Sequence, residues 1–124
     1  MSNSTAYRIA AVLGLLAVAL GAFGAHSLKD LLIQNQTISI WEKAVLYHFV
    51  HAVMLFVLAH RNPLPSGPWF CFLAGILIFS GSLYLLAATN YRLLGAVTPI
   101  GGASFLAGWI WLACCGLPKP TQAA

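Results

Sequence analysis

Four long apolar stretches alternate with shorter polar segments along the chain. Each stretch holds about 17 to 23 residues, and a helix needs about 20 apolar residues to cross the hydrocarbon core of a bilayer. The pattern therefore predicts an all-α integral membrane protein, with four transmembrane helices in an antiparallel bundle that forms one domain, residues 1–124. The expected spans are residues 9–25, 43–60, 69–88 and 93–115.

The connections between the spans differ in character. Residues 26–42 mix charged, polar and apolar positions, which suits an interfacial connection with a short amphipathic piece near residues 28–33. The next connection, residues 60–68, contains three prolines, which cannot continue a helix. Thr89–Arg92 is short enough to force the fourth span back beside the third. Residues 116–124 form a tail that we expect to be disordered.

The first stretch has two interpretations. It resembles a cleaved signal peptide in having one basic residue before an apolar run that ends in small residues. However, its small residues recur at spacings of four, three, four and three, which places them on one helical stripe, as close helix packing in lipid requires. A disposable signal has no need of this stripe, so we favour a first span. The stripe consists of Ala10, Gly14, Ala17, Gly21 and Gly24.

Aromatic residues at the span ends indicate the membrane surfaces, and basic residues bear on the orientation of the chain. Tyr7, Trp41, Trp69 and Tyr91 fall at predicted span ends, where amphipathic rings prefer the headgroup level. Four spans place both termini on one side of the membrane. The positive-inside rule does not choose that side, because three basic residues lie with the termini and three lie opposite. They are Arg8, Arg61 and Lys119, and Lys29, Lys43 and Arg92.

Composition supports the membrane assignment and narrows the function. Hydrophobic residues make up 60% of the chain and charged residues 6%, and a mean hydropathy of +0.87 does not suit a small soluble domain. The scattered basic residues form no nucleic-acid footprint. The cysteines, Cys71, Cys114 and Cys115, show no metal-binding spacing, and we expect no cofactor.

Polar and small residues interrupt the apolar stretches at one common depth. At 1.5 Å per residue, His51 and Gly81 both lie roughly 10 Å inside the side away from the termini, and Thr98 lies at a similar depth. These residues are therefore predicted to form one polar layer. Its members are His26, Tyr47, His51, Ser80, Gly81, Ser82, Tyr84, Thr98, Pro99, Gly101 and Gly102.

The layer has a structural interpretation, in which hydroxyl groups join helices and glycines let them approach. Pro99 is expected to kink the fourth helix and to free the carbonyl near Gly95. Ser80 and Tyr84 share a helical face, and either could bond this carbonyl. Ser82 points nearly opposite, and we expect no contribution from it.

The alternative interpretation is a binding site for a small molecule, a proton, or a metal or haem around His51, Tyr47 and Pro99. Two histidines three residues apart do not fix a third metal ligand, so this signal is weak. The serines have no visible base or GxSxG turn for nucleophilic catalysis. We therefore expect a protein that is not an enzyme.

Four motifs occur in order between Leu15 and Trp109. They are Gly21–His26 with Leu28–Lys29, Trp41 with Tyr47 and His51, Phe79–Tyr84, and Thr98–Gly102 with Gly108–Trp109. In this order they resemble the small membrane proteins called domain of unknown function 423, whose eukaryotic relatives are called transmembrane protein 256. His48 departs from the family pattern, which more often has glutamine, and this leaves His51 as the better candidate for a shared site.

The resemblance implies a four-helix protein of the bacterial inner membrane with both termini in the cytoplasm. It supplies no activity. From the small-residue stripes, including Gly101, Ser104 and Gly108 on the fourth span, we expect an accessory or self-associating bundle. Its expected partners are membrane lipids and either a second copy of the chain or a membrane complex.

Overall fold

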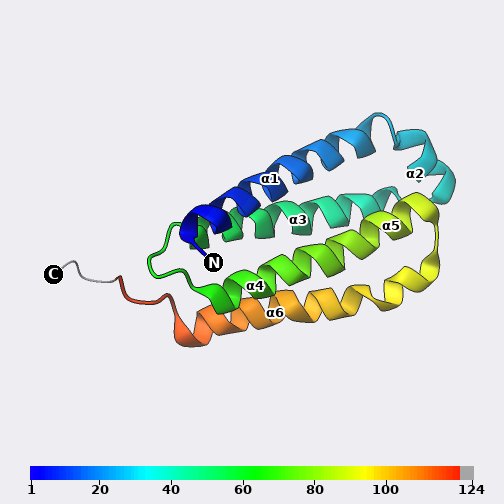
Figure 1. Ribbon diagram of the computed structural model, residues 1–124. Helices are drawn as coiled ribbons and strands as arrows, with labels where there is room; N and C mark the ends of the chain where they lie inside the picture. The colour runs from blue at the N-terminus through cyan, green and yellow to red at the C-terminus, as the bar shows by residue number, and fades with distance from the viewer. Residues whose placement is uncertain (121–124) are drawn as a thin grey trace.

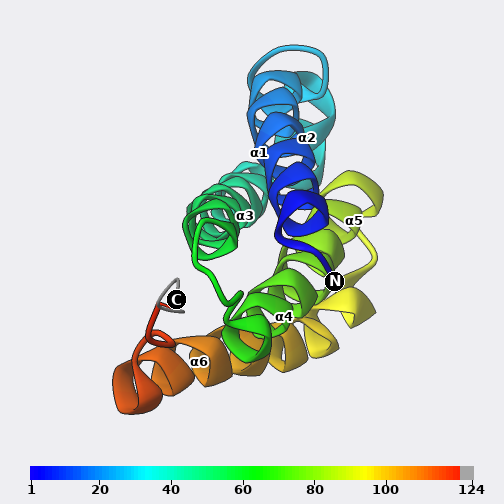
Figure 2. The same cartoon turned by 60° about the vertical axis from the view of Figure 1, so that its left-hand side comes forward.

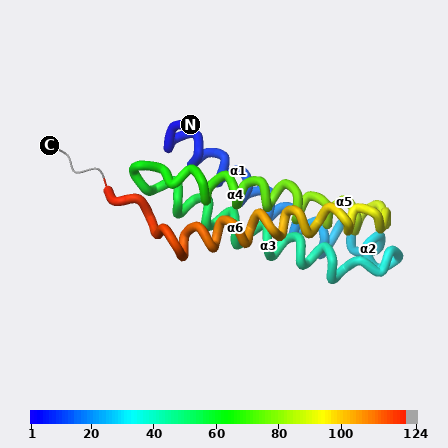
Figure 3. Tube along the Cα trace, turned by 90° about the horizontal axis from the view of Figure 1, so that it is seen from below, coloured from blue at the N-terminus to red at the C-terminus, as the bar shows by residue number. Residues whose placement is uncertain are grey.

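The computed structural model describes residues 1–120, and four helical stretches in it are long and apolar enough to cross a membrane. They run along one long axis, and the first residues of the chain lie at the same end of the bundle as residues 116–120 (Figures 1 and 3). This confirms the predicted fold class. The stretches are α1 (Asn3–Ala25), α3 (Ile38–Ala59), the continuous α4 (Ser66–Gly75), η1 (Ile76–Ser80) and α5 (Gly81–Thr89), and finally η2 (Arg92–Ala96) with α6 (Thr98–Cys115).

The helices begin earlier than the apolar pattern predicted. Before α1, the Ser2 side chain accepts a hydrogen bond from the Thr5 backbone N–H, and this cap lets polar residues form the first turn. The Asn3 side chain then donates to the carbonyls of Ala59 and Arg61, at 3.1 and 2.6 Å. These bonds fix the start of α1 to the end of α3.

The predicted interfacial connection contains one short helix, α2 (Lys29–Asn35). The Thr37 hydroxyl donates to the Ala87 carbonyl at 2.8 Å, and the Asn35 amide donates to the same carbonyl at 3.0 Å. The connection is therefore tied to the end of α5. Residues 116–120 are not helical, and the rest of the predicted tail, residues 121–124, lies outside the described residues.

The four spans do not contact one another equally. α1 packs mainly against α3, and α6 packs mainly against α4 and η1. α3 also packs along the third span, so α3 and the third span lie between α1 and α6 (Figure 2). The bundle thus has two inner spans and two outer spans.

Two tryptophans lie near helix starts, at the predicted span ends, but their rings are buried between helices, where they serve as interior anchors. Trp41 is 5% exposed and its indole N–H donates to the Leu20 carbonyl at 2.9 Å. Trp69 is fully buried and donates to the Leu55 carbonyl at 3.2 Å. Both indole groups find backbone partners on a neighbouring helix, which removes their need for the headgroup region.

The small-residue stripes are used inside the chain. On α1, Ala10 and Ala17 are buried, and a Cβ atom at Gly24 would overlap the Trp41 ring. On α6, a Cβ at Gly108 would lie 2.6 Å from the Phe72 ring. These stripes let the chain pack against itself, so they are no longer evidence for contact with another copy.

The third span contains a π-helical turn, η1, that the sequence did not predict. The Gly81 N–H donates to the Ile76 carbonyl, five residues earlier. At this turn α6 comes closest, because a Cβ at Gly101 would lie only 2.7 Å from the Phe79 Cα. A π turn often adjusts a helix at a site of special contact, and here the contact is that with Gly101.

Pro99 stands at a helix start. The fourth span opens as the 3₁₀ helix η2, and α6 begins at Thr98 with Pro99 in its first turn. A proline is well tolerated there because the first N–H groups of a helix have no intrahelical partner. The expected break in the fourth span thus takes the form of a 3₁₀-to-α junction.

Candidate functional site

The polar layer contains two sets of hydrogen bonds on opposite faces of the third span. On one face, the Ser80 hydroxyl donates to the Ala44 carbonyl of α3 at 2.8 Å. On the other face, the hydroxyls of Ser82 and Thr98 lie 2.7 Å apart and join α5 to α6. The prediction that Ser82 would not contribute was therefore wrong. Because the third span lies between α3 and α6, both of its faces meet a helix.

Tyr84 bonds to α3, so the prediction that Ser80 or Tyr84 would bond the carbonyl near Gly95 on the fourth span was also wrong. The Tyr84 hydroxyl lies 2.9 Å from Nδ1 of His48. A long helical side chain points back over the preceding turn, and this direction brings the hydroxyl toward the depth of Ser80. This preferred side-chain direction was the feature of the sequence that could have predicted a pair between Tyr84 and His48.

His48, which the sequence analysis considered only as a weak candidate metal or haem ligand three residues from His51, is 3% exposed. Its Nδ1 bonds Tyr84, and its Nε2 has no hydrogen-bond partner among the described residues. The Trp41 ring packs edge-on against Tyr84, with 4.8 Å between the ring centroids. These three aromatic side chains fill the region between α3 and α5.

His51 has both ring nitrogens engaged. The Trp109 indole N–H donates to Nε2 at 3.0 Å, and an indole nitrogen can only donate. Nε2 is therefore the acceptor, so Nδ1 carries the hydrogen and donates to the Tyr47 carbonyl at 2.7 Å. These bonds fix a neutral tautomer. A metal ion or an added proton at Nε2 would have to displace Trp109.

The His51 ring also stacks on Phe105, with 3.6 Å between ring centroids and 14° between planes. Phe105 and Trp109 come from the part of α6 that follows Gly102, which lay outside the predicted layer. The family motif Gly108–Trp109 was a signal for Trp109, but nothing in the spacing placed it beside His51.

A groove of about 440 Å³ runs beside His51 between α3 and α6. Tyr47 stands on its α3 side, where the ring is 40% exposed and the hydroxyl has no hydrogen-bond partner among the described residues. We call this the α3–α6 groove. It is lined mainly by apolar and small residues: Tyr47, His51, Phe79, Pro99, Gly102, Ala103, Phe105, Leu106 and Trp109.

The predicted layer is therefore divided in space. Tyr47, His51, Pro99 and Gly102 meet in the α3–α6 groove, whereas Ser80 and Tyr84 face α3 from the third span. Gly101 packs against η1, and a Cβ at Gly81 would meet nothing within 4 Å. His26 is exposed in the turn after α1, so it does not join the layer.

The described residues contain no cluster of three or more His, Cys, Asp or Glu side chains that could hold a metal ion. The three cysteines are free thiols, and two of them, Cys114 and Cys115, are exposed at the end of α6. Within the part of the chain that is described, a metal would therefore have at most two such protein ligands in this conformation.

Residues 20–102 match the family model described as protein of unknown function, DUF423. The chain belongs to this family. It is 44% identical over 111 residues to the UPF0382 membrane protein YwdK of Bacillus subtilis, with 84% of this chain and 89% of the relative covered. UPF0382 membrane proteins of Staphylococcus haemolyticus and Staphylococcus epidermidis are 43% and 45% identical over 109 residues, with 84% of this chain and 88% of each relative covered. No solved structure matches the chain.

The DUF423 match includes every residue of the predicted polar layer, from His26 to Gly102. It also includes both hydroxyl bonds of the third span and the contact of Gly101 with η1. The predicted resemblance is confirmed, and the protein is a multi-span membrane protein of this family.

A double-mutant cycle tests the bond that joins α5 to α6. We expect Ser82→Ala and Thr98→Val to be non-additive in the free energy of unfolding, with a coupling of about 0.6 kcal/mol, the usual value for hydrogen bonds between membrane helices. Detergent unfolding followed by circular dichroism measures it. The control cycle combines Ser80→Ala with Thr98→Val, and it should be additive because Ser80 bonds α3. Additivity in the first cycle would show that the two hydroxyls do not interact.

Proposed function

We propose that the protein is a non-enzymatic accessory component of the bacterial inner membrane, with both termini in the cytoplasm, that associates with a second copy of itself through the α3–α6 groove. The carrying observation is a set of hydrogen bonds within the chain, made by the hydroxyls of the polar layer other than that of Tyr47 and by both ring nitrogens of His51. These bonded groups hold the helices together. The apolar α3–α6 groove remains as a surface that a partner could contact.

The ridge beside the groove supports self-association. Ile100, Leu106 and Ile110 of α6 are each at least 60% exposed, and Gly102 and Ala103 on the same helix provide a low surface next to them. When two copies of the chain meet across a two-fold axis, the ridge of each copy can enter the groove of the other. Small residues at the contact allow the close backbone approach on which helix association in lipid depends.

The geometry of His51 favours this role over binding of a metal, haem or proton. Nε2, the nitrogen nearest to Trp109, already accepts a hydrogen bond, and Nδ1 donates to Tyr47. Binding at either nitrogen would cost one of these bonds in a region without water to replace it. His51 therefore acts in our proposal as a joint between α3 and α6.

Disulfide cross-linking in native membranes tests the proposal. In a chain whose own cysteines are replaced by alanine, we expect Leu106→Cys to give a covalent dimer on mild oxidation. Leu106 belongs both to the exposed ridge and to the groove lining, which in our proposal places it near the two-fold axis, where a residue meets its own copy. The matched control is Leu15→Cys on α1, a leucine of similar exposure at the opposite edge of the bundle. We expect at least fivefold less dimer from it. Equal dimer from both positions, or monomer from both, would contradict the proposed interface.

A further inference from the structure

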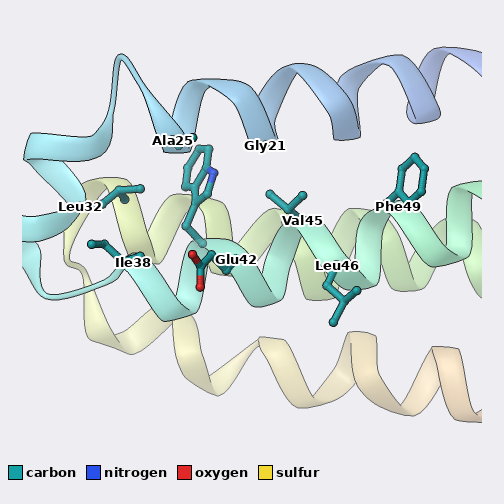
Figure 4. Close-up of a pocket in the computed structure, with 10 residues that line it drawn as sticks. Gly21, Ala25, Leu32, Ile38, Glu42, Val45, Leu46 and Phe49 are labelled. Carbon is teal, nitrogen blue, oxygen red and sulfur yellow. The ribbon is translucent and has the colours of Figure 1, made fainter.

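A second groove, of about 370 Å³, lies between α1 and α3 (Figure 4). On the α1 side it is bordered by Gly21, Gly24 and Ala25, which present almost no side chain. On the α3 side it follows one helical face from Ile38 to Phe49. We call it the α1–α3 groove. It exists because the small residues of α1 leave the α3 side chains uncovered.

Glu42 places a carboxylate in this otherwise mainly apolar groove. It is one of only two acidic residues in the chain, and it is the only charged residue among those that line the groove. No lysine, arginine or histidine nitrogen of the described residues lies within 4.0 Å of its carboxylate. The carboxylate is exposed about 6 Å from the first residue of α3, which is near the headgroup level of a membrane crossed by this helix.

The apolar part of the groove covers about two thirds of one leaflet. From Glu42 to Phe49 the helix rises about 10 Å, and half of a hydrocarbon core of about 30 Å is 15 Å. Beyond Glu42 the lining is apolar, with Val45, Leu46 and Phe49 following along α3. A straight hydrocarbon chain that starts at the membrane surface fits a groove of this length and polarity.

We propose that the α1–α3 groove binds one phospholipid with a primary ammonium headgroup, such as phosphatidylethanolamine. One acyl chain lies along Gly21 and Val45, and the ammonium group donates hydrogen bonds to the Glu42 carboxylate. Charge complementarity selects this headgroup, since an anionic lipid without an amine would place negative charge beside Glu42. A quaternary ammonium has the same charge as a primary one but no N–H to donate.

Native mass spectrometry of the full chain measures the binding. The protein is released from detergent after incubation with phosphatidylethanolamine, phosphatidylcholine or phosphatidylglycerol of identical acyl chains. We expect one retained phosphatidylethanolamine per chain, about three- to fivefold more than either other lipid, as an ion pair at the membrane surface would give. Equal retention of all three lipids would overturn the headgroup assignment.

Two variants with matched controls locate the site. Glu42→Gln should remove the headgroup preference while retaining the fold, and Asp30→Asn, which changes the other acidic residue, should leave it intact. Gly21→Leu places a side chain toward Val45, because a Cβ there already lies 3.4 Å from that residue, and it should reduce lipid retention at least threefold. Gly14→Leu is its control on the same helix, since a Cβ at Gly14 meets nothing within 4 Å.

Several outcomes would overturn the proposal. One is an unchanged headgroup preference in Glu42→Gln, and another is full lipid retention in a folded Gly21→Leu variant. Dimers that exclude lipid and are lost in Gly21→Leu would show that a second copy of the chain occupies the groove. If Gly21→Leu does not fold, the Glu42→Gln measurement decides alone, because that side chain is exposed.

Discussion

Gly101→Ala is expected to lower the free energy of unfolding by about 2–3 kcal/mol, at the upper end of the usual cost of overpacking. The added methyl group would overlap the Phe79 backbone, since a Cβ at Gly101 lies 2.7 Å from the Phe79 Cα. Backbone cannot rotate away as a side chain can, so α6 and η1 must separate. Unfolding in a denaturing detergent, followed by far-ultraviolet circular dichroism, measures the loss.

Gly102→Ala is the control on the same helix. A Cβ at Gly102 meets only the edge of the Phe79 ring, at 3.7 Å, which is an ordinary contact. Alanine also favours a helix over glycine by about 1 kcal/mol, so this variant should be neutral or slightly stabilising. If both substitutions had the same effect, the close approach of α6 to η1 would not be the cause.

Trp69→Ala is the second substitution with a large expected effect, and it should lower the free energy of unfolding by about 2–3 kcal/mol. Trp69 is fully buried in the larger apolar cluster and donates to the Leu55 carbonyl. This destabilisation is at or below the smallest usually caused by replacing a buried tryptophan with alanine in a soluble protein. Membrane helices unfold into lipid, so the substitution removes packing contacts but does not change how much apolar surface is exposed to water. The same unfolding experiment provides the measurement.

Two further variants separate the contributions at this position. Trp69→Phe keeps most of the ring but removes the N–H donor, so it should cost about 1 kcal/mol. Phe70→Ala alters the neighbouring residue, which is half-exposed to lipid, and should cost less than about 1 kcal/mol. If Phe70→Ala lowered the free energy of unfolding as much as Trp69→Ala does, burial in the apolar cluster would not explain the effect of Trp69→Ala.

Hydropathy predicted the spans well because the membrane constrains length and polarity along each helix. It did not predict the neighbours of each helix. The sequence analysis expected no contribution from Ser82 because it points away from Ser80. Both faces of the third span meet another helix, however, and each serine makes a hydrogen bond to its neighbouring helix. That fact depends on the order of helices in the bundle, which no single stretch of sequence specifies.

The tryptophans and the small-residue stripes show the same limit. Trp41 is close enough to the start of α3 to suit a headgroup position, but a glycine across from it on α1 gives its ring a place inside. The pair Trp41 and Gly24 is visible only once the two helices are adjacent. A stripe of small residues likewise indicates a close contact without saying whether the partner helix belongs to the same chain.

The π turn has a consequence for how the third span is built. One additional residue in a helix turns everything after it by about 100°, so the directions of α4 and α5 side chains are set separately, although their backbones are continuous. α4 can therefore keep Trp69 and Phe72 aimed at the apolar cluster while α5 presents Ser82 to one neighbour and Tyr84 to another. In this short chain, one additional residue therefore lets a single membrane helix direct its side chains as two separate helices would.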